Sequence, residues 1–142
     1  VTNTATLSGA GLTTPVQPAS TVNARAAAYL TIGKAVSPAT VAENGTLTYT
    51  FTIQNYGNTA AAETDNVTVS DTFSPILKAI SVTYNGAAWT EGTQYTYNAA
   101  TGAFATTAGQ ITVPAASLTR DAATGAVVVT PGISTLTVTG TV

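Results

Sequence analysis

The chain has 142 residues, of which 7% are charged: four Lys or Arg and six Asp or Glu, for a net charge of −2. This length fits one domain, or one domain with an arm, and the few cations exclude a basic patch for nucleic acid. No apolar run approaches the roughly 20 residues of a membrane span, so no membrane insertion is expected. With neither Cys nor His, the chain lacks the usual nucleophile–base pairs and metal ligands. We therefore expect no conventional enzyme, no metal and no cofactor.

The first nine residues, V-T-N-T-A-T-L-S-G, alternate as a strand with one buried face does. One side carries Val1, Asn3, Ala5 and Leu7, and the other carries Thr. Residues 9–20 contain two Gly and two Pro without periodicity, which predicts a loop or linker. Residues 21–24 are a candidate second short strand.

From Ala26 onward, short alternating runs separated by turn signals predict an antiparallel β-sandwich. The best strand is Thr46–Asn55, and Asn44-Gly45 and Asn85-Gly86 are strong turn signals. Further strands are predicted at residues 29–36, 66–71, 80–84, 111–113, 127–130 and 135–142. A helical turn is predicted only at residues 60–65.

Several motifs then follow one another in a recognisable order. L-T-I-G-K-A-V-S-P (residues 30–38) precedes a Gly, an alternating Thr-rich strand and an Asn-x-Gly turn, and N-V-T-V-S-D-T-F (residues 66–73) follows. This order resembles the conserved-repeat domain of bacterial and archaeal surface proteins that is catalogued as domain of unknown function eleven. The match covers most of the chain after Leu30 and is loosest between Tyr84 and Val129. The resemblance implies an immunoglobulin-like sandwich on a cell surface.

The two ends of the chain depart from that family. There, the late strand (here residues 131–142) is followed by a segment similar to V-T-N-T-A-T-L-S-G, which this chain carries at residues 1–9 instead. One copy placed after another restores the family order. We therefore expect residues 1–25 to form a donor strand and linker, and residues 26–142 to form a sandwich completed by the donor strand of a neighbouring copy, which adds a strand to an open sheet edge.

These observations predict a structural subunit of a pilus-like or matrix fibre, polymerised head to tail by donor-strand exchange. Its partners would be copies of itself, and a cell-surface anchor or other surfaces are further candidates. The Met-free start at Val1 suggests a secreted, extracellular chain whose signal peptide has been removed. The alternative is a surface adhesion or binding module whose N-terminal strand folds back onto its own sandwich, since the twenty or so residues before Leu30 are long enough to double back.

Three polar residues interrupt the alternation on predicted inward faces: Lys34, Asp71 and Asn3. One interpretation is a buried ion pair, or strand-end residues that turn out to solvent. The resemblance suggests another, because pili and adhesins of Gram-positive bacteria contain Lys–Asn isopeptide bonds promoted by a nearby carboxylic acid. Asp71 would then be the catalytic promoter, and Lys34 and Asn3 the bonded pair that links neighbouring subunits.

Other candidate sites are less specific. Asn44 and Asn66 begin glycosylation sequons, which arise easily in a Thr-rich chain. Trp89 with Tyr95 and Tyr97 is a candidate sugar-binding platform or a packing cluster. The acidic residues are scattered, and nothing in the sequence indicates the paired carboxylates of a glycosidase.

Overall fold

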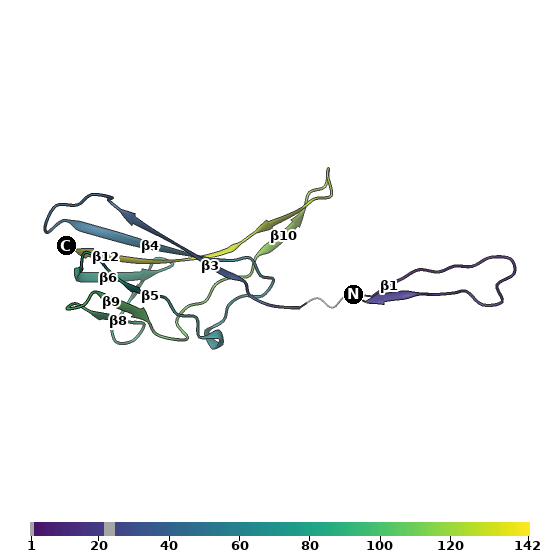
Figure 1. Cartoon of the computed structure of the whole chain (residues 1–142), viewed down its shortest axis with the longest axis horizontal. Coiled ribbons are helices and arrows are strands. Elements are labelled where there is room, and N and C mark those ends of the chain that lie inside the picture. Colours follow the sequence, from purple (N-terminus) through teal and green to yellow (C-terminus); the bar gives the residue numbers. More distant parts are fainter. Residues whose placement is uncertain (1, 22–24) are drawn as a thin grey trace.

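The structure, a computed structural model, describes residues 2–21 and 25–142. Val1 of the expected donor strand and residues 22–24 of the candidate second strand lie outside the described residues. Figure 1 shows two parts: a sandwich of strands, and an N-terminal hairpin that extends away from it. The C-terminus lies at the end of the sandwich opposite this hairpin.

Two antiparallel sheets of unequal size make up the sandwich, which confirms the predicted all-β sandwich. The larger sheet has the strand order β3-β4-β12-β6-β7, and the smaller has the order β5-β9-β8. The strands of the larger sheet are β3 (Leu30–Ser37), β4 (Thr46–Asn55), β6 (Lys78–Tyr84), β7 (Ala87–Trp89) and β12 (Gly132–Thr141). Those of the smaller sheet are β5 (Ser70–Thr72), β8 (Tyr95–Asn98) and β9 (Ala103–Thr106).

The core lies between the two sheets and follows the alternation of β4. Its apolar residues are buried every second position while the intervening Thr residues are only partly buried, as the pleat of a half-buried strand requires. From the opposite layer Phe73 stacks on Tyr49 with ring centroids 4.8 Å apart, and Phe104 packs on Phe73 at 5.6 Å. Leu136 and Val138 of β12 are fully buried in the same core.

The predicted turns are confirmed, and their backbone geometry explains the residues used. Asn85 and Gly86 both have positive φ, at 49° and 83°, and they connect β6 to β7 as a two-residue hairpin. Such a turn favours Asn-Gly because both central residues are left-handed. The expected helical turn is present as the 3₁₀ helix η1 (Glu63–Asp65).

Outside the two sheets are two further hairpins. One is the N-terminal hairpin of β1 (Thr2–Thr4) and β2 (Ala19–Thr21), and the other is formed by β10 (Ser117–Arg120) and β11 (Val127–Thr130). The N-terminal ladder continues past β1, because the Ala5 N–H donates to the Pro18 carbonyl and Leu7 pairs with Val16. The expected linker at residues 9–20 thus contains both the turn and the returning strand of a hairpin.

Candidate functional site: an open groove at one edge of the sandwich

The inner face of β3 is the feature that most distinguishes this sandwich from a closed one. Register places Ile32 opposite Ile53 and Val36 opposite Tyr49, both of them core residues of β4. Ile32 and Val36 therefore lie on the core face, yet they are 55% and 44% exposed. The smaller sheet ends at β5 and leaves this part of the larger sheet uncovered.

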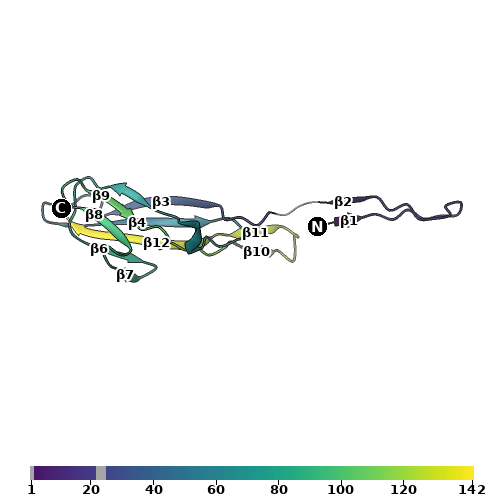
Figure 2. The same cartoon turned by 90° about the horizontal axis from the view of Figure 1, so that it is seen from below.

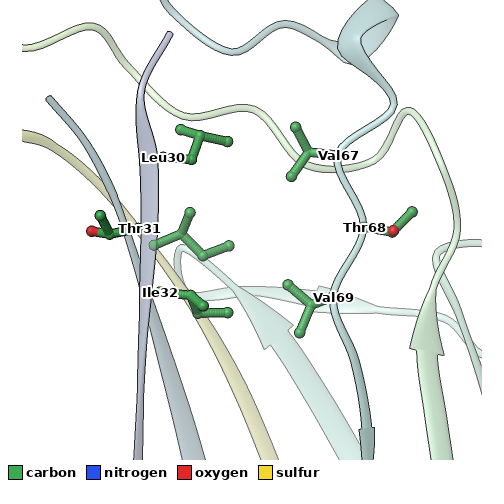
Figure 3. A pocket seen from close by; sticks show the side chains of 7 residues that line it. Leu30, Thr31, Ile32, Val67, Thr68 and Val69 are labelled. Atoms are coloured by element: carbon green, nitrogen blue, oxygen red, sulfur yellow. The ribbon is translucent and has the colours of Figure 1, made fainter. Parts of the chain in front are cut away.

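The uncovered strip forms a groove, here called the edge groove, between β3 and residues 67–71. One part is a cavity of about 170 Å³ in which Leu30 and Ile32 point toward Val67 and Val69, while Thr31 points away (Figure 3). That volume is similar to that of an engineered cavity of about 150 Å³ that takes up benzene, so it suits an apolar side chain. A second cavity of about 200 Å³ shares Ile32 and Val69 and extends to Lys34 and Asp71. The two cavities are consecutive parts of one groove.

Strands with one free side border this groove. β3 pairs with β4 alone and β5 pairs with β9 alone among the described strands. The unpaired N–H and C=O groups along such edges can add another strand. The edge groove thus combines an apolar floor with two hydrogen-bonding rims.

Lys34 and Asp71 meet inside the groove, each coming from a different sheet. The Lys34 ammonium forms an ion pair with Asp71 Oδ2 and lies 4.7 Å from the ring centroid of Tyr49 and 5.7 Å from that of Phe51. Both side chains therefore point inward, as the alternation of side chains along each strand predicts, although Lys34 is 42% and Asp71 19% exposed. Lys34 and Asp71 thus form the ion pair of the first interpretation, but the pair lies in a half-open groove and not in a closed core.

The Asp71 carboxylate retains acceptor capacity toward the groove. Its Oδ1 accepts a hydrogen bond from the Thr72 N–H at 2.8 Å. Its Oδ2 is shielded from solvent and, among the described residues, has the Lys34 ammonium as its neighbour but receives no well-aligned hydrogen bond. The Asp71 carboxylate therefore lies beside the Lys34 amine, in the part of the groove that both residues line.

The expected donor residues that the structure describes, Asn3, Ala5 and Leu7, belong to the N-terminal hairpin, which lies away from the groove of its own chain (Figure 1). The pairing puts one set of six on a single face, and these are Asn3, Ala5, Leu7, Val16, Pro18 and Ser20. The opposite face carries Thr side chains and Gln17, whose amide donates to the Thr6 hydroxyl. Leu7 is 63% exposed, so the apolar face of this hairpin is left uncovered by the residues that the structure describes. Sequence reasoning missed the second strand of this face, although Val16, Pro18 and Ser20 are spaced by two.

The remaining candidate sites are dispersed. Trp89 stacks on Tyr84 with centroids 4.9 Å apart, whereas Tyr95 and Tyr97 belong to β8 of the other sheet. The Tyr97 hydroxyl donates to the Leu77 carbonyl at 2.7 Å, so these aromatic side chains pack and do not form one platform. Asn44 and Asn66 are exposed and take left-handed φ values of 61° and 51°.

Comparisons with family models, with curated proteins and with solved structures gave no match for this chain. Within residues 2–21 and 25–142, no helix has the length and apolar character needed to cross a membrane. No group of three or more acidic residues suited to hold a metal ion is found among the residues that the structure describes.

Proposed function

We propose that this protein is the structural subunit of an extracellular, pilus-like fibre, in which the N-terminal hairpin of one copy fills the edge groove of the next. The observation that carries the proposal is a complementary pair of features within one chain. The core face of β3 lies uncovered, and the hairpin has an apolar face that no described residue of the chain covers. On this proposal the sandwich is immunoglobulin-like and belongs to the surface-repeat family that its motifs resemble.

The spacing of side chains on the hairpin matches the groove when the two run antiparallel. Asn3 then meets the ion pair of Lys34 and Asp71, which are the polar residues of the groove. Two positions along the hairpin from Asn3, Ala5 meets Ile32 and Val69. Two positions further, Leu7 meets Leu30 and Val67. A shift by one residue would turn the Thr face of the hairpin into the apolar groove, so this register is favoured by burial.

The number of strands supports the same arrangement. Among the described residues the larger sheet has five strands and the smaller has three, and the smaller sheet covers β4 but stops short of β3. A donated hairpin supplies two strands. Added at the β5 edge, it gives two sheets of five strands and covers the exposed face of β3.

The direction in which each copy donates its hairpin supports open-ended assembly. The hairpin leaves from the end of the sandwich at which β3 begins, and the C-terminus lies at the opposite end (Figure 1). In the antiparallel register the base of the hairpin, near Asn3, enters the groove at its C-terminal end, and the tip reaches toward Leu30. All copies then point the same way, and such a head-to-tail contact that does not close generates a filament.

The polar end of the groove suits a covalent link between copies, which we include in the proposal. The Lys34 ammonium passes a proton to Asp71, and the free amine attacks the side-chain carbonyl carbon of Asn3 while protonated Asp71 polarises its oxygen. The Lys34 Nζ–Asn3 Cγ bond forms, and the proton that the attacking amine then gives up passes through the Asp71 carboxyl to Asn3 Nδ2. The Asn3 Cγ–Nδ2 bond breaks, and the nitrogen leaves as ammonia. Atoms and charge balance without an oxidant or reductant, and the product amide replaces a charged pair at the groove.

Electron microscopy of the purified chain tests the assembly. We expect filaments from the wild type and none from Leu7→Asp, because that substitution places a carboxylate in the apolar part of the groove. Thr6→Asp is the matched control, since Thr6 lies on the other face of the hairpin, and it should still form filaments. A wild-type protein that is a monodisperse monomer would support the self-closed adhesion module instead.

A further inference from the structure

The β10–β11 hairpin, here called the arm, projects beyond both sheets. Its two strands pair only with each other among the described strands, and every residue of both strands is exposed. Figures 1 and 2 show the arm extending from the same end of the sandwich as the N-terminal hairpin. A two-stranded hairpin is marginally stable alone in water, so the arm lacks the packing surface that such a hairpin needs.

One face of the arm is apolar. Leu118 pairs with Val129, and Arg120 pairs with Val127, so these four side chains share a face. Leu118 is 60% exposed, Val129 45% and Val127 65%. The other face carries Ser117, Thr119, Val128 and Thr130 and is mostly polar. An amphipathic hairpin with an exposed apolar face is typical of a contact surface.

The tip of the arm is held in shape by its own hydrogen bonds. Asp121 Oδ1 accepts from the N–H groups of Ala123 and Thr124 at 3.0 and 2.7 Å and from the Thr124 hydroxyl at 2.9 Å. These bonds, those from Thr124 foremost, lower the pKa of the Asp121 carboxyl. Arg120 Nε donates to the Gly125 carbonyl at 3.2 Å. The arm is therefore preformed, and docking it costs little ordering of its turn.

We propose that the apolar face of the arm docks on a second copy of this chain, namely the copy whose edge groove receives the N-terminal hairpin. This inference rests on the proposed function. Because the hairpin and the arm leave from the same end (Figure 2), the receiving copy lies beyond that end, next to the arm. The receiving copy turns its C-terminal end toward the arm. At that end Ile76 is an apolar side chain that is 41% exposed. Its position follows from Lys78, two residues later in the chain, which pairs with Thr141 near the end of β12.

Hydrogen exchange on assembled fibres tests this contact. In wild-type fibres, we expect amides of residues 118–120 and 127–130 to exchange at least about tenfold more slowly than in the unassembled Leu7→Asp protein. A double variant, Val127→Thr with Val129→Thr, keeps β-branched side chains in the strand but removes the apolar contact. It should still form fibres through the N-terminal hairpin, with the protection of the arm lost. Val128→Thr, on the opposite face, should keep that protection.

The outcomes separate this inference from the proposed function. Fibres in which the arm exchanges as fast as in Leu7→Asp overturn the docking of the arm and leave the fibre itself intact. Protection that survives in the Val127→Thr, Val129→Thr variant, or that arises only when fibres bundle side by side, also overturns it. A wild type that forms no fibres overturns both proposals.

Discussion

Lys34 of β3 and Asp71 of β5 form an ion pair that spans the edge groove and joins two different sheets. Because Lys34 is 42% exposed, water screens the pair, and exposed pairs of this kind stabilise a fold by only about 0–1 kcal/mol. Stability is therefore a weak explanation for a cation and an anion on the core side of two edge strands. Their position facing the apolar groove suits a reaction or a contact with an inserted strand better.

The first prediction concerns the covalent link. Boiling fibres in SDS should leave a ladder of multimers, since an amide bond resists denaturation. Lys34→Ala, Asp71→Ala and Asn3→Ala should each collapse the ladder to monomer, while mass spectrometry of wild-type fibres finds the linked peptide lighter by one ammonia. Lys78→Ala removes an exposed Lys of β6 and is the control that should keep the ladder. Wild-type fibres that run entirely as monomer exclude the bond without excluding strand exchange.

A second prediction concerns Asn55, which is fully buried. Its Oδ1 accepts from the N–H groups of Tyr29 and Gly57, and its Nδ2 donates to the carbonyls of Thr59 and Pro114. Asn55→Leu leaves these buried backbone groups without partners, so we expect a loss of about 3 kcal/mol in the free energy of unfolding.

Chemical denaturation of the unassembled Leu7→Asp protein, with and without Asn55→Leu, gives this value without interference from fibres. Gln54→Leu is the neighbouring control, because the one hydrogen bond of this side chain among the described residues is a long one, accepted from the Tyr56 hydroxyl at 3.5 Å. A change below about 1 kcal/mol in Asn55→Leu would mean that water satisfies the freed groups.

The third prediction is a loss of stability at alkaline pH that depends on Tyr95. Burial first, and the nearby Glu91 carboxylate second, raise the pKa of the Tyr95 hydroxyl. The unfolded chain ionises Tyr at its usual value of about 10, whereas the folded chain resists ionisation. The contribution of Tyr95 is therefore complete below that pH and is lost as pH rises through the folded pKa.

Unfolding curves from pH 8 to about 12, a range that spans the usual Tyr pKa, give the measurement. Tyr95→Phe should flatten the alkaline decline, and Glu91→Gln should only reduce it, because burial is the larger cause. An unchanged slope in Tyr95→Phe would assign the alkaline decline to other groups.

Much of the sandwich follows from local sequence. The alternation of Leu47, Tyr49, Phe51 and Ile53 with Thr fixes the buried face of β4, and Asn85-Gly86 fixes a hairpin because both residues tolerate positive φ. Parity likewise places Lys34 and Asp71 on inward faces. These features depend on neighbours in sequence, which is why they are predictable.

The openness of the groove is not a local property. Parity tells which way Ile32 points, but its 55% exposure depends on where the other sheet ends, which is set by long-range pairing. The returning strand of the N-terminal hairpin was missed for a different reason. Two prolines and a short apolar pattern around Val16 look like a linker, and only the pairing with Leu7 reveals a strand.

The last prediction tests the direction of strand exchange. Ile32→Asp places a carboxylate in the groove, so that copy should donate its hairpin but receive none. Leu7→Asp should receive a hairpin but donate none. Each variant alone should stay monomeric, and a mixture of the two should give a heterodimer that does not extend, measured by light scattering after size exclusion. Thr31→Asp, whose side chain points away from the groove (Figure 3), is the control and should form filaments.

The same mixture locates the covalent bond. In the heterodimer, Asn3 comes from the Ile32→Asp copy and Lys34 from the Leu7→Asp copy. Adding Lys34→Ala to the Leu7→Asp copy should abolish the SDS-resistant dimer, and adding it to the Ile32→Asp copy should leave that dimer intact. Loss of the dimer in both cases would mean that Lys34 supports the groove and does not form the bond. Filaments from either single variant would contradict the assigned register, because both substitutions place a charge where that register buries an apolar side chain.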